Sequence, residues 1–404
     1  MMPALKVRNP ERKNVEESHM DEIETKSWLD LPQDLIFSMM ERLYVADRVR
    51  LRAVCKDWHL QPNRGIKAID KLPWTMEYKW RNPKSISFWS VCKLYEPLHH
   101  NRRLSYMVEK GRMRGRKNFA KAEVRASRYS WVLFYKDDYW QGKFFFFNPF
   151  TKEVIFLPCL ESLVSEFATF SLTPTSPHCF VFVPYERNCN EISINIYNHA
   201  DKTWKTHDLV ANDHPLGTLK AVGYMEGTFY CHFSSFHLAA FNIVDQELSL
   251  VMTTCPAMDH LDDSLFNYFS RSYLLECEGD LLLVYLFESL LCWHQLYVLK
   301  LDWSRNEWVR VSRLGGRAMF LGETSFYVSA GGETEIIANR IYYHHDGVPE
   351  FQTLDLCSFD EYDSRDHDYL TWQKEKKREA GNAKIYGYCR KSLKTIWIQP
   401  PQDS

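Results

Sequence analysis

Residues 101–128 form the first of three charged clusters that could carry chemistry in this chain of 404 residues. Ten lysine and arginine side chains lie there against two glutamates. Such a stretch could bind phosphate groups, direct nuclear import or attract an acidic partner. Aromatic side chains are too few among these charges to form a platform for stacked bases, so nucleic acid is not an expected ligand. We favour a solvated loop, with nuclear import as the functional alternative.

The other two clusters contain the residue types of metal ligands without the required geometry. His344 and His345 are adjacent, and neighbouring residues on a strand point to opposite faces. Residues 355–368 are acidic, but they lack the glycine and the terminal glutamate of a calcium-binding loop. We therefore expect a turn and a solvated acidic loop, and we expect no metal and no other cofactor.

Catalytic motifs are missing from the sequence. It contains no Gly-x-Ser-x-Gly elbow, no His-Glu-x-x-His pair and no glycine-rich phosphate loop. We expect a non-catalytic protein, and a hydrolase whose site is assembled from distant loops is the weakest alternative.

The composition indicates a soluble globular protein, with 45% hydrophobic residues, 25% charged residues and a net charge of −2. This near-neutral balance gives no general attraction to nucleic acid or membrane. The longest apolar run, residues 281–293, is interrupted by Glu288 and is too short to span a bilayer. Eleven cysteines without a Cys-x-x-Cys pair indicate free thiols in a reducing compartment, so we expect the nucleus, the cytoplasm or both.

Residues 28–58 have helical periodicity and present a different kind of surface. Pro32 suits the first turn of a helix, because that turn does not use its missing N–H. The apolar positions that follow helical spacing are Leu31, Leu35, Ile36, Met39, Met40 and Leu43, and then Leu51, Val54, Cys55 and Trp58. A segment this short cannot bury so much apolar surface by itself, so part of it should contact another chain. Periodicity alone leaves open a three-helix cap that folds onto its own domain.

The stretches LDLPQDLIFSMMERL and VRLRAVCKDW resemble the F-box, from the Leu-Pro pair at its start to the Val-Cys-Lys-x-Trp sequence at its end. In F-box proteins this segment docks on the Skp adaptor of a cullin-RING (SCF) ubiquitin ligase. The resemblance implies that the adaptor-binding residues are Leu31, Pro32, Leu35, Ile36, Leu43, Val54 and Trp58. Some of these must form the core of the module itself, and Leu35 and Trp58 are the expected internal pair.

From residue 72 onward the pattern changes to short aromatic and β-branched runs separated by turn residues. Five runs place one apolar residue directly before an Asn or Asp and another four residues before it, and they end at Asn148, Asn198, Asn242, Asp302 and Asp355. Six positions after the first four come Val154, Trp204, Leu248 and Trp308. Each run predicts a buried strand, an Asn/Asp turn and a return strand. The intervals of 44 to 60 residues are close to the size of a propeller blade.

A second hairpin is predicted upstream of several runs, in WVLFYKDDYW, VGYMEGTFYC, YLLECEGDLLLVY and EIIANRIYYHH. Two hairpins make one four-stranded blade, and a ring of blades leaves few strand edges exposed. A β-sandwich is the rival architecture. Features such as Asn148-Pro149, Leu157-Pro158 and the Asp302…Trp308 strand pair resemble plant F-box proteins whose carboxy-terminal domain is a KIB-type β-propeller, a group often described as F-box/kelch-repeat proteins.

The predicted fold is therefore α+β and multidomain, with a small amino-terminal three-helix F-box followed by a mainly antiparallel β-propeller of about six blades. We expect a disordered lead over residues 1–26, the F-box helical module and linker over 27–70, and the propeller over 71–400. The resemblance implies a substrate-recognition subunit of an SCF-type ubiquitin ligase. Its partners would be a Skp-type adaptor, through it cullin, and an unknown target protein. A non-ligase F-box scaffold that sequesters a partner is the alternative.

Overall fold

The computed structural model describes residues 31–42, 72–81, 87–95, 103–112, 122–138, 141–162, 164–212, 215–258, 270–288, 294–344, 351–355 and 394–400. The chain forms two compact units, residues 1–42 and residues 43–404. In the first unit the described element is helix α1, over Gln33–Arg42. The second unit is built from strands, with short 3-10 helices at Pro256–Met258 (η3) and Gly332–Ile337 (η4).

The α+β fold class predicted from the sequence is wrong. Within the described ranges one α-helix accompanies twenty-four strands, so the fold is nearly all β. The ten residues of α1 do not form a helical layer of the core, which the strands build by packing on one another. The expected F-box of three helices is not shown, because α1 covers only its first part and residues 43–58 lie outside the described ranges. The predicted β-propeller is confirmed, and so is its blade number.

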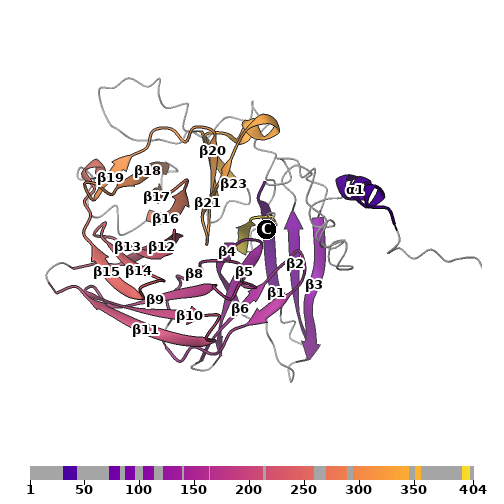
Figure 1. Cartoon of the computed structure of the whole chain (residues 1–404), viewed down its shortest axis with the longest axis horizontal. Helices are drawn as coiled ribbons and strands as arrows, with labels where there is room; N and C mark the ends of the chain where they lie inside the picture. The colour runs from indigo at the N-terminus through magenta and orange to yellow at the C-terminus, as the bar shows by residue number, and fades with distance from the viewer. Residues whose placement is uncertain are drawn as a thin grey trace, which may run out of the picture. The chain divides into compact units, whose positions relative to one another are not determined.

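Six four-stranded sheets form the six blades (Figure 1). From the innermost strand outward, blade 1 holds β24 (Lys394–Ile398), β1 (Trp74–Arg81), β2 (Ser87–Tyr95) and β3 (Arg103–Arg112). Blade 2 holds β4 (Glu123–Arg128), β5 (Trp131–Asp138), β6 (Gln141–Phe147) and β7 (Val154–Phe156). Blade 3 holds β8 (Thr169–Phe170), β9 (Phe180–Asn188), β10 (Glu191–Asn198) and β11 (Thr203–Val210).

The second half of the ring has the same construction. Blade 4 holds β12 (Leu219–Met225), β13 (Thr228–Phe233), β14 (Leu238–Asn242) and β15 (Glu247–Val251). Blade 5 holds β16 (Ser270–Cys277), β17 (Asp280–Glu288), β18 (His294–Asp302) and β19 (Glu307–Arg310). Blade 6 holds β21 (Phe326–Ser329), β20 (Arg317–Leu321), β22 (Arg340–His344) and β23 (Phe351–Asp355).

The innermost strands surround a central channel, and blade 1 closes the ring. Contacts run from β24 to β4 and then through β8, β12 and β16 to β21. Strand β24 comes from the far end of the chain and pairs antiparallel with β1, which places Thr75 opposite Trp397. Trp397 also links blade 1 to blade 6, because its Nε1 donates to the Leu321 carbonyl at 3.1 Å and its ring packs edge-on against Phe320.

The core of the propeller consists of six apolar clusters, one between each pair of neighbouring blades. Successive residues of a strand point to opposite faces, so a strand with a cluster on each side must be apolar throughout. In β6, Phe145 and Phe147 join the cluster shared with blade 1, whereas Phe144 and Phe146 join the cluster shared with blade 3. This alternation explains why the middle strands are uninterrupted hydrophobic runs in the sequence.

Four of the predicted Asn/Asp hairpins are confirmed. The predicted apolar residues lie opposite each other in the pairs Phe147–Val154, Tyr197–Trp204, Phe241–Leu248 and Leu301–Trp308. In each turn the side-chain oxygen of the Asn or Asp accepts the N–H two residues later, as Asn148 Oδ1 does from Phe150 at 2.9 Å. The residue four positions after it has a positive φ in all four turns, at Lys152, Lys202, Gln246 and Asn306. The same local hydrogen bond therefore sets the same turn in blades 2 to 5.

Blade 6 departs from the predicted pattern. The segment EIIANRIYYHH was expected to form a hairpin, but its first half belongs to η4 and only Arg340–His344 is a strand. Because β21 already pairs with one edge of β20, β22 pairs with the other edge and runs parallel to it. The Thr334 hydroxyl donates to the Gly331 carbonyl at 3.0 Å and accepts its N–H at 3.1 Å, which closes a tight turn where a strand was expected.

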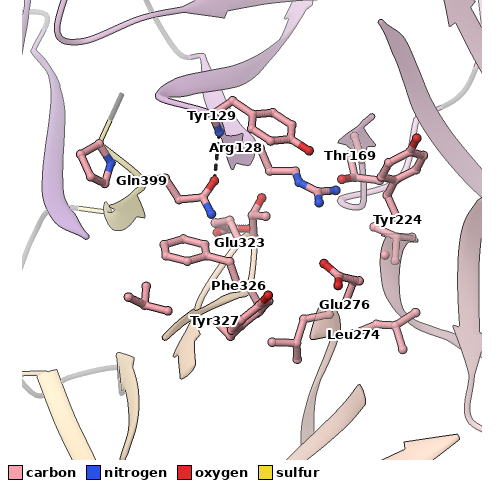
Figure 2. Close-up of a pocket in the computed structure, with 18 of the residues that line it drawn as sticks. Arg128, Tyr129, Thr169, Tyr224, Leu274, Glu276, Glu323, Phe326, Tyr327 and Gln399 are labelled. Carbon is pink, nitrogen blue, oxygen red and sulfur yellow. Dashed lines mark hydrogen bonds between the residues drawn. The ribbon is translucent and has the colours of Figure 1, made fainter. Parts of the chain in front are cut away.

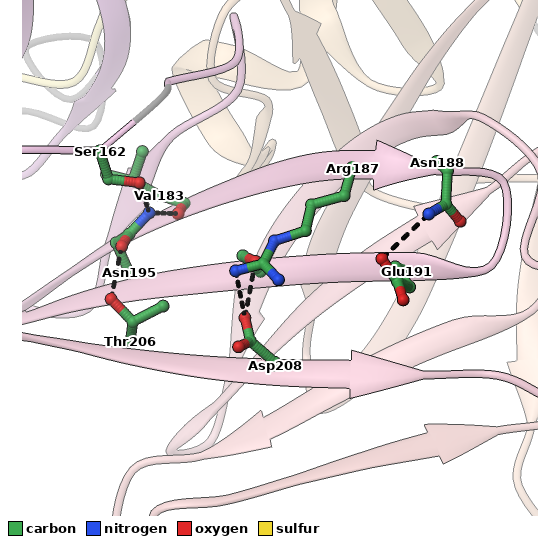
Figure 3. A network of polar contacts seen from close by, with 9 residues as sticks. Ser162, Val183, Arg187, Asn188, Glu191, Asn195, Thr206 and Asp208 are labelled. Carbon is green, nitrogen blue, oxygen red and sulfur yellow. Dashed lines mark hydrogen bonds and ion pairs between the residues drawn. The ribbon is translucent and has the colours of Figure 1, made fainter.

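A buried asparagine in blade 3 shows how a polar residue is accommodated within a hydrophobic run (Figure 3). Asn195 Nδ2 donates to the Val183 carbonyl and to Ser162 Oγ, each at 3.4 Å. Its Oδ1 accepts a hydrogen bond from Thr206 Oγ1 at 2.9 Å. A buried amide costs free energy unless it is hydrogen-bonded, so this network makes the asparagine of INIYN tolerable and links β9, β10 and β11.

His232 is a buried titratable group in β13, between blades 4 and 5. Its Nε2 lies 2.6 Å from the Tyr285 hydroxyl, and its ring contacts that of Phe236. Burial, with smaller contributions from the charges of Lys220 and His237, lowers the pKa of His232 from 6.5 to about 3. The imidazole is therefore neutral in the folded protein at physiological pH.

Trp397→Ala should weaken the closure of the ring. The side chain is 2% exposed, and truncating a buried aromatic residue costs about 3–5 kcal/mol of unfolding free energy. Thermal denaturation should show a clearly lower Tm. Trp303→Ala is the control, because it removes an indole that is 42% exposed, and its effect should be much smaller. Equal losses in the two variants would contradict a closing role for Trp397.

His232→Gln should reduce the acid sensitivity of the fold. Between pH 6.5 and about 3 the unfolded chain binds a proton that the folded protein does not, so stability falls as the pH falls through this window. From pH 7.5 to pH 5 this one group should remove about 2 kcal/mol of unfolding free energy. Denaturant titrations at the two pH values should show a smaller loss for His232→Gln than for the wild type. The exposed His178→Gln serves as control, and an unchanged loss in His232→Gln would refute the assignment.

Candidate functional sites on helix α1 and in the central channel

Helix α1 begins where the Leu-Pro pair predicts it. The Pro32 carbonyl accepts hydrogen bonds from the N–H groups of Leu35 at 3.0 Å and of Ile36 at 3.2 Å. Asp34 lies in the first turn, where a carboxylate interacts favourably with the positive end of the helix dipole. The predicted role of Pro32 in starting the helix is thus confirmed.

Part of the predicted adaptor-binding row is exposed. Leu35 is 53% exposed and Met39 is 37% exposed, and Pro32 is exposed as well. Ile36 is only 3% exposed and Leu31 is half-buried. Leu35 and Ile36 lie on different sides of the helix, and Ile36 is the buried one. The expected internal pair of Leu35 and Trp58 stays a prediction, because Trp58 lies outside the described ranges. The remaining predicted residues, Leu43, Val54 and Trp58, lie outside the described ranges.

The central channel of the propeller contains a pocket of about 440 Å³ (Figure 2). Ligand pockets typically have volumes of roughly 300–1,000 Å³. The side chains that define it come from all six blades, namely Arg128, Thr169, Tyr224, Glu276, Tyr327 and Gln399. Gln399 Oε1 accepts the N–H of Tyr129 at 3.0 Å, so the segment after β24 forms part of the wall. Ring closure and pocket formation therefore depend on the same strand.

The innermost strands around the pocket differ in length. Strand β8 has two residues, whereas β12 has seven and β16 has eight. In the wall formed by blades 4 and 5, Gly223 allows β12 and β16 to approach closely, since a Cβ at this position would lie 3.0 Å from Leu274 Cγ.

Aromatic rings hold a cationic side chain in the wall of the pocket. The guanidinium carbon of Arg128 lies 5.2 Å from the centroid of the Tyr129 ring and 5.3 Å from that of Tyr224. Such contacts are favourable because a cation is attracted to the negative face of an aromatic ring. Burial raises the pKa of Tyr224, so its hydroxyl stays protonated and can act as a hydrogen-bond donor. Glu276 brings a carboxylate into the same pocket.

Comparison with known proteins identifies the family. The profile of the KIB1-4 beta-propeller family matches residues 103–372, which is more than half of the chain. "F-box/kelch-repeat protein At1g57790" of Arabidopsis thaliana is 28% identical and covers 93% of this chain and 96% of its own length. The chain belongs to the plant F-box proteins with a KIB1-4 beta-propeller. The predicted resemblance is confirmed.

Further relatives of this F-box propeller protein match over most of its length. "F-box protein At3g56470" of Arabidopsis thaliana is 27% identical over 74% of each chain. "F-box protein At4g00893" of the same species is 26% identical over 83% of this chain and 80% of its own. Among solved structures, TolB from Acinetobacter baumannii covers 70% of this chain and 61% of its own at 9% identity, with a TM-score of 0.37 that supports no conclusion.

The basic stretch of this F-box protein is not one solvated loop. Residues 103–112 form β3 and residues 123–128 form β4, and the segment between them lies outside the described ranges. Arg125 pairs with Glu123 at 2.9 Å and its guanidinium carbon lies 5.0 Å from the centroid of the Tyr135 ring. Arg128 lines the channel pocket. The loop prediction is therefore wrong at both ends, and nuclear import stays an untested prediction.

The described residues contain no group of three or more His, Cys, Asp or Glu side chains that could hold a metal ion. His344 ends β22, while His345, Asp346 and residues 356–368 lie outside the described ranges. In the same described ranges no helix is long and apolar enough to cross a membrane.

Sequence reasoning missed the channel pocket. Its residues are distributed from Arg128 to Pro400, and no local spacing marks them. A partial signal was present, because Arg128 and Tyr129 directly precede a predicted strand and Glu276 lies inside another. Recognising these positions as innermost requires knowledge of which strand of each blade faces the channel.

Gly223→Val should destabilise the inner ring next to the pocket. The added side chain would collide with Leu274, and overpacking of this kind costs about 1–3 kcal/mol. Gly331→Val is the matched control, because a Cβ at that position meets nothing within 4 Å and its φ of −172° is extended. Chemical denaturation should separate the two variants. Equal stability of both would contradict the tight contact between β12 and β16.

Proposed function

We propose that this protein is the substrate-recognition subunit of an SCF-type E3 ubiquitin ligase. Its F-box segment would bind a Skp-type adaptor, and through it cullin, while the propeller binds the target protein. The observation that carries the proposal is the exposed apolar row of α1 in a chain of the F-box family. Leu35 and Met39 expose their side chains one helical turn apart, close to Pro32. Burial of such apolar surface against a partner contributes about 25 cal/mol per Å², which the entropic cost of association partly offsets.

The proposed role requires no catalytic residue in this chain. A receptor that binds both adaptor and target raises the concentration of the target near the ubiquitin-loaded carrier enzyme. A partner then performs the transfer. The propeller suits this role, because a rigid scaffold of packed blades holds surface loops and channel side chains in constant positions.

The proposal also places the protein in the nucleus or the cytoplasm. The described ranges contain seven free cysteines, five of which are buried. Free thiols of this kind are typical of proteins from reducing compartments. The two exposed ones are Cys159 and Cys189.

Leu35→Asp tests the adaptor surface. A carboxylate in the middle of an apolar interface would have to lose its hydration, so we expect at least a ten-fold reduction in the amount of Skp-type adaptor that co-purifies. Val244→Asp is the matched control, since this valine is 80% exposed in the β14–β15 turn of the propeller. Both variants should keep the Tm of the wild type. Wild-type adaptor binding by Leu35→Asp would refute the proposal.

A reconstituted ligase distinguishes a receptor from a scaffold that only sequesters a partner. Co-purification with degradation stalled would supply a bound target. A receptor should support ubiquitylation of that target, and Leu35→Asp should abolish it. Adaptor binding without any ubiquitylation would favour the scaffold.

A further inference from the structure

Three charged side chains line the channel pocket, the cationic Arg128 and the carboxylates Glu276 and Glu323, and the pair considered for ligand binding is Arg128 and Glu276. Arg128 comes from β4 in blade 2 and Glu276 from β16 in blade 5, so they belong to opposite sides of the ring. Figure 2 shows both side chains directed into the pocket. Within the described ranges no ion pair joins them, although each is half-buried in a shared cavity.

The Arg128 guanidinium is fixed in place and still able to donate hydrogen bonds. Its contacts in the described part of the chain are with the rings of Tyr129 and Tyr224, and no carboxylate pairs with it there. A guanidinium carries five N–H donors in a planar fork that matches a carboxylate, and contact with aromatic rings does not use these donors. Arg128 is therefore a preorganised binding group for an anionic oxygen pair.

Glu276 is the corresponding group for a cation. One carboxylate oxygen accepts the N–H of Gly279 at 3.0 Å, which holds the side chain at the turn between β16 and β17. In the part of the chain that the structure describes, the other oxygen accepts no hydrogen bond and can act as an acceptor. Tyr327 lies on the same wall, and its pKa is raised first by burial and then by the charge of Glu276.

We propose that this pocket binds a dipolar ligand, with a carboxylate on Arg128 and an ammonium or guanidinium group on Glu276. A purely anionic ligand would be repelled by Glu276 and Glu323, and a purely cationic one would leave the Arg128 guanidinium without an anionic partner in a partly desolvated site, which is costly. If the proposed function holds, the ligand is a target segment with adjacent basic and acidic side chains. A free amino acid carries the same two charges and is the alternative source.

Four blocked fluorescent peptides test this pairing, with central dipeptides Lys-Asp, Lys-Asn, Gln-Asp and Gln-Asn. Fluorescence anisotropy with the full-length protein at physiological salt should give a Kd for Lys-Asp at least ten-fold below those of the other three. Free L-alanine, added as competitor and measured directly by calorimetry, tests the small-molecule source. Equal affinity for all four peptides would overturn the proposal. So would a result in which neither the peptides nor L-alanine bind.

Variants assign each charge to its side chain. Arg128→Gln should remove the ten-fold gain in affinity that Asp gives a peptide and keep the gain that Lys gives. Glu276→Gln should remove the gain from Lys and keep the gain from Asp. The glutamine at position 276 can still accept the Gly279 N–H. If L-alanine is the ligand that binds, each variant should weaken it at least ten-fold. Arg187→Gln is the control, because Arg187 pairs with Asp208 at 3.2 Å on blade 3, away from the pocket (Figure 3). Variant affinities equal to the wild type would overturn the assignment.

The two proposals can fail separately. Arg128→Gln and Glu276→Gln should leave adaptor co-purification unchanged, because these residues lie in the channel of the propeller. Leu35→Asp should leave ligand binding by the pocket unchanged. A variant that retains the activity it is expected to lose therefore shows which proposal is wrong.

Discussion

Neighbouring blades of the propeller pack face to face, through six apolar clusters that have no member in common. Because each blade is covered on both faces, none of them has a complete core by itself. The ring is therefore stable only when the last interface, between blades 6 and 1, is also made. Phe320, Tyr342 and Trp397 form the centre of that interface, and Trp397 comes from the end of the described chain.

Closure of the ring also brings together the polar residues of the channel pocket. It brings Arg128, Glu276 and Gln399 to one cavity although they belong to three blades. The close approach of β12 and β16 at Gly223 brings blades 4 and 5 together beside the same cavity. A rigid ring holds these polar groups apart. The charges of Arg128 and Glu276 can therefore be paired by a bound ligand and not by one another.

The two proposed binding surfaces use different physical chemistry. The row of Leu35 and Met39 on α1 offers apolar area, which supplies affinity with little dependence on the partner's charge. The channel pocket offers fixed charges, which discriminate between ligands more strongly than they add to affinity. This division suits a receptor that binds one constant partner and selects among many targets.

The sequence by itself determined the features that depend on local interactions. The Asn148 turn and its three equivalents could be predicted because a side-chain oxygen bonds a backbone N–H two residues away. The continuous apolar run of β6 and the helix start at Pro32 are local in the same sense. The propeller could be predicted from these repeats, and its family from the motifs that resemble it. The α+β class was wrong because it counted a short helical motif as a separate domain.

Only the tertiary structure decided the features that depend on distant residues. The parallel pairing of β22 with β20 follows from the place that β21 occupies, and the pocket is lined by residues from all six blades. The exposure of Leu35 and the burial of Ile36 were likewise not determined by the helical spacing of the apolar residues. Periodicity identifies an apolar row, but it does not state what packs against it, since burial is a relation between segments that the chain brings together only on folding.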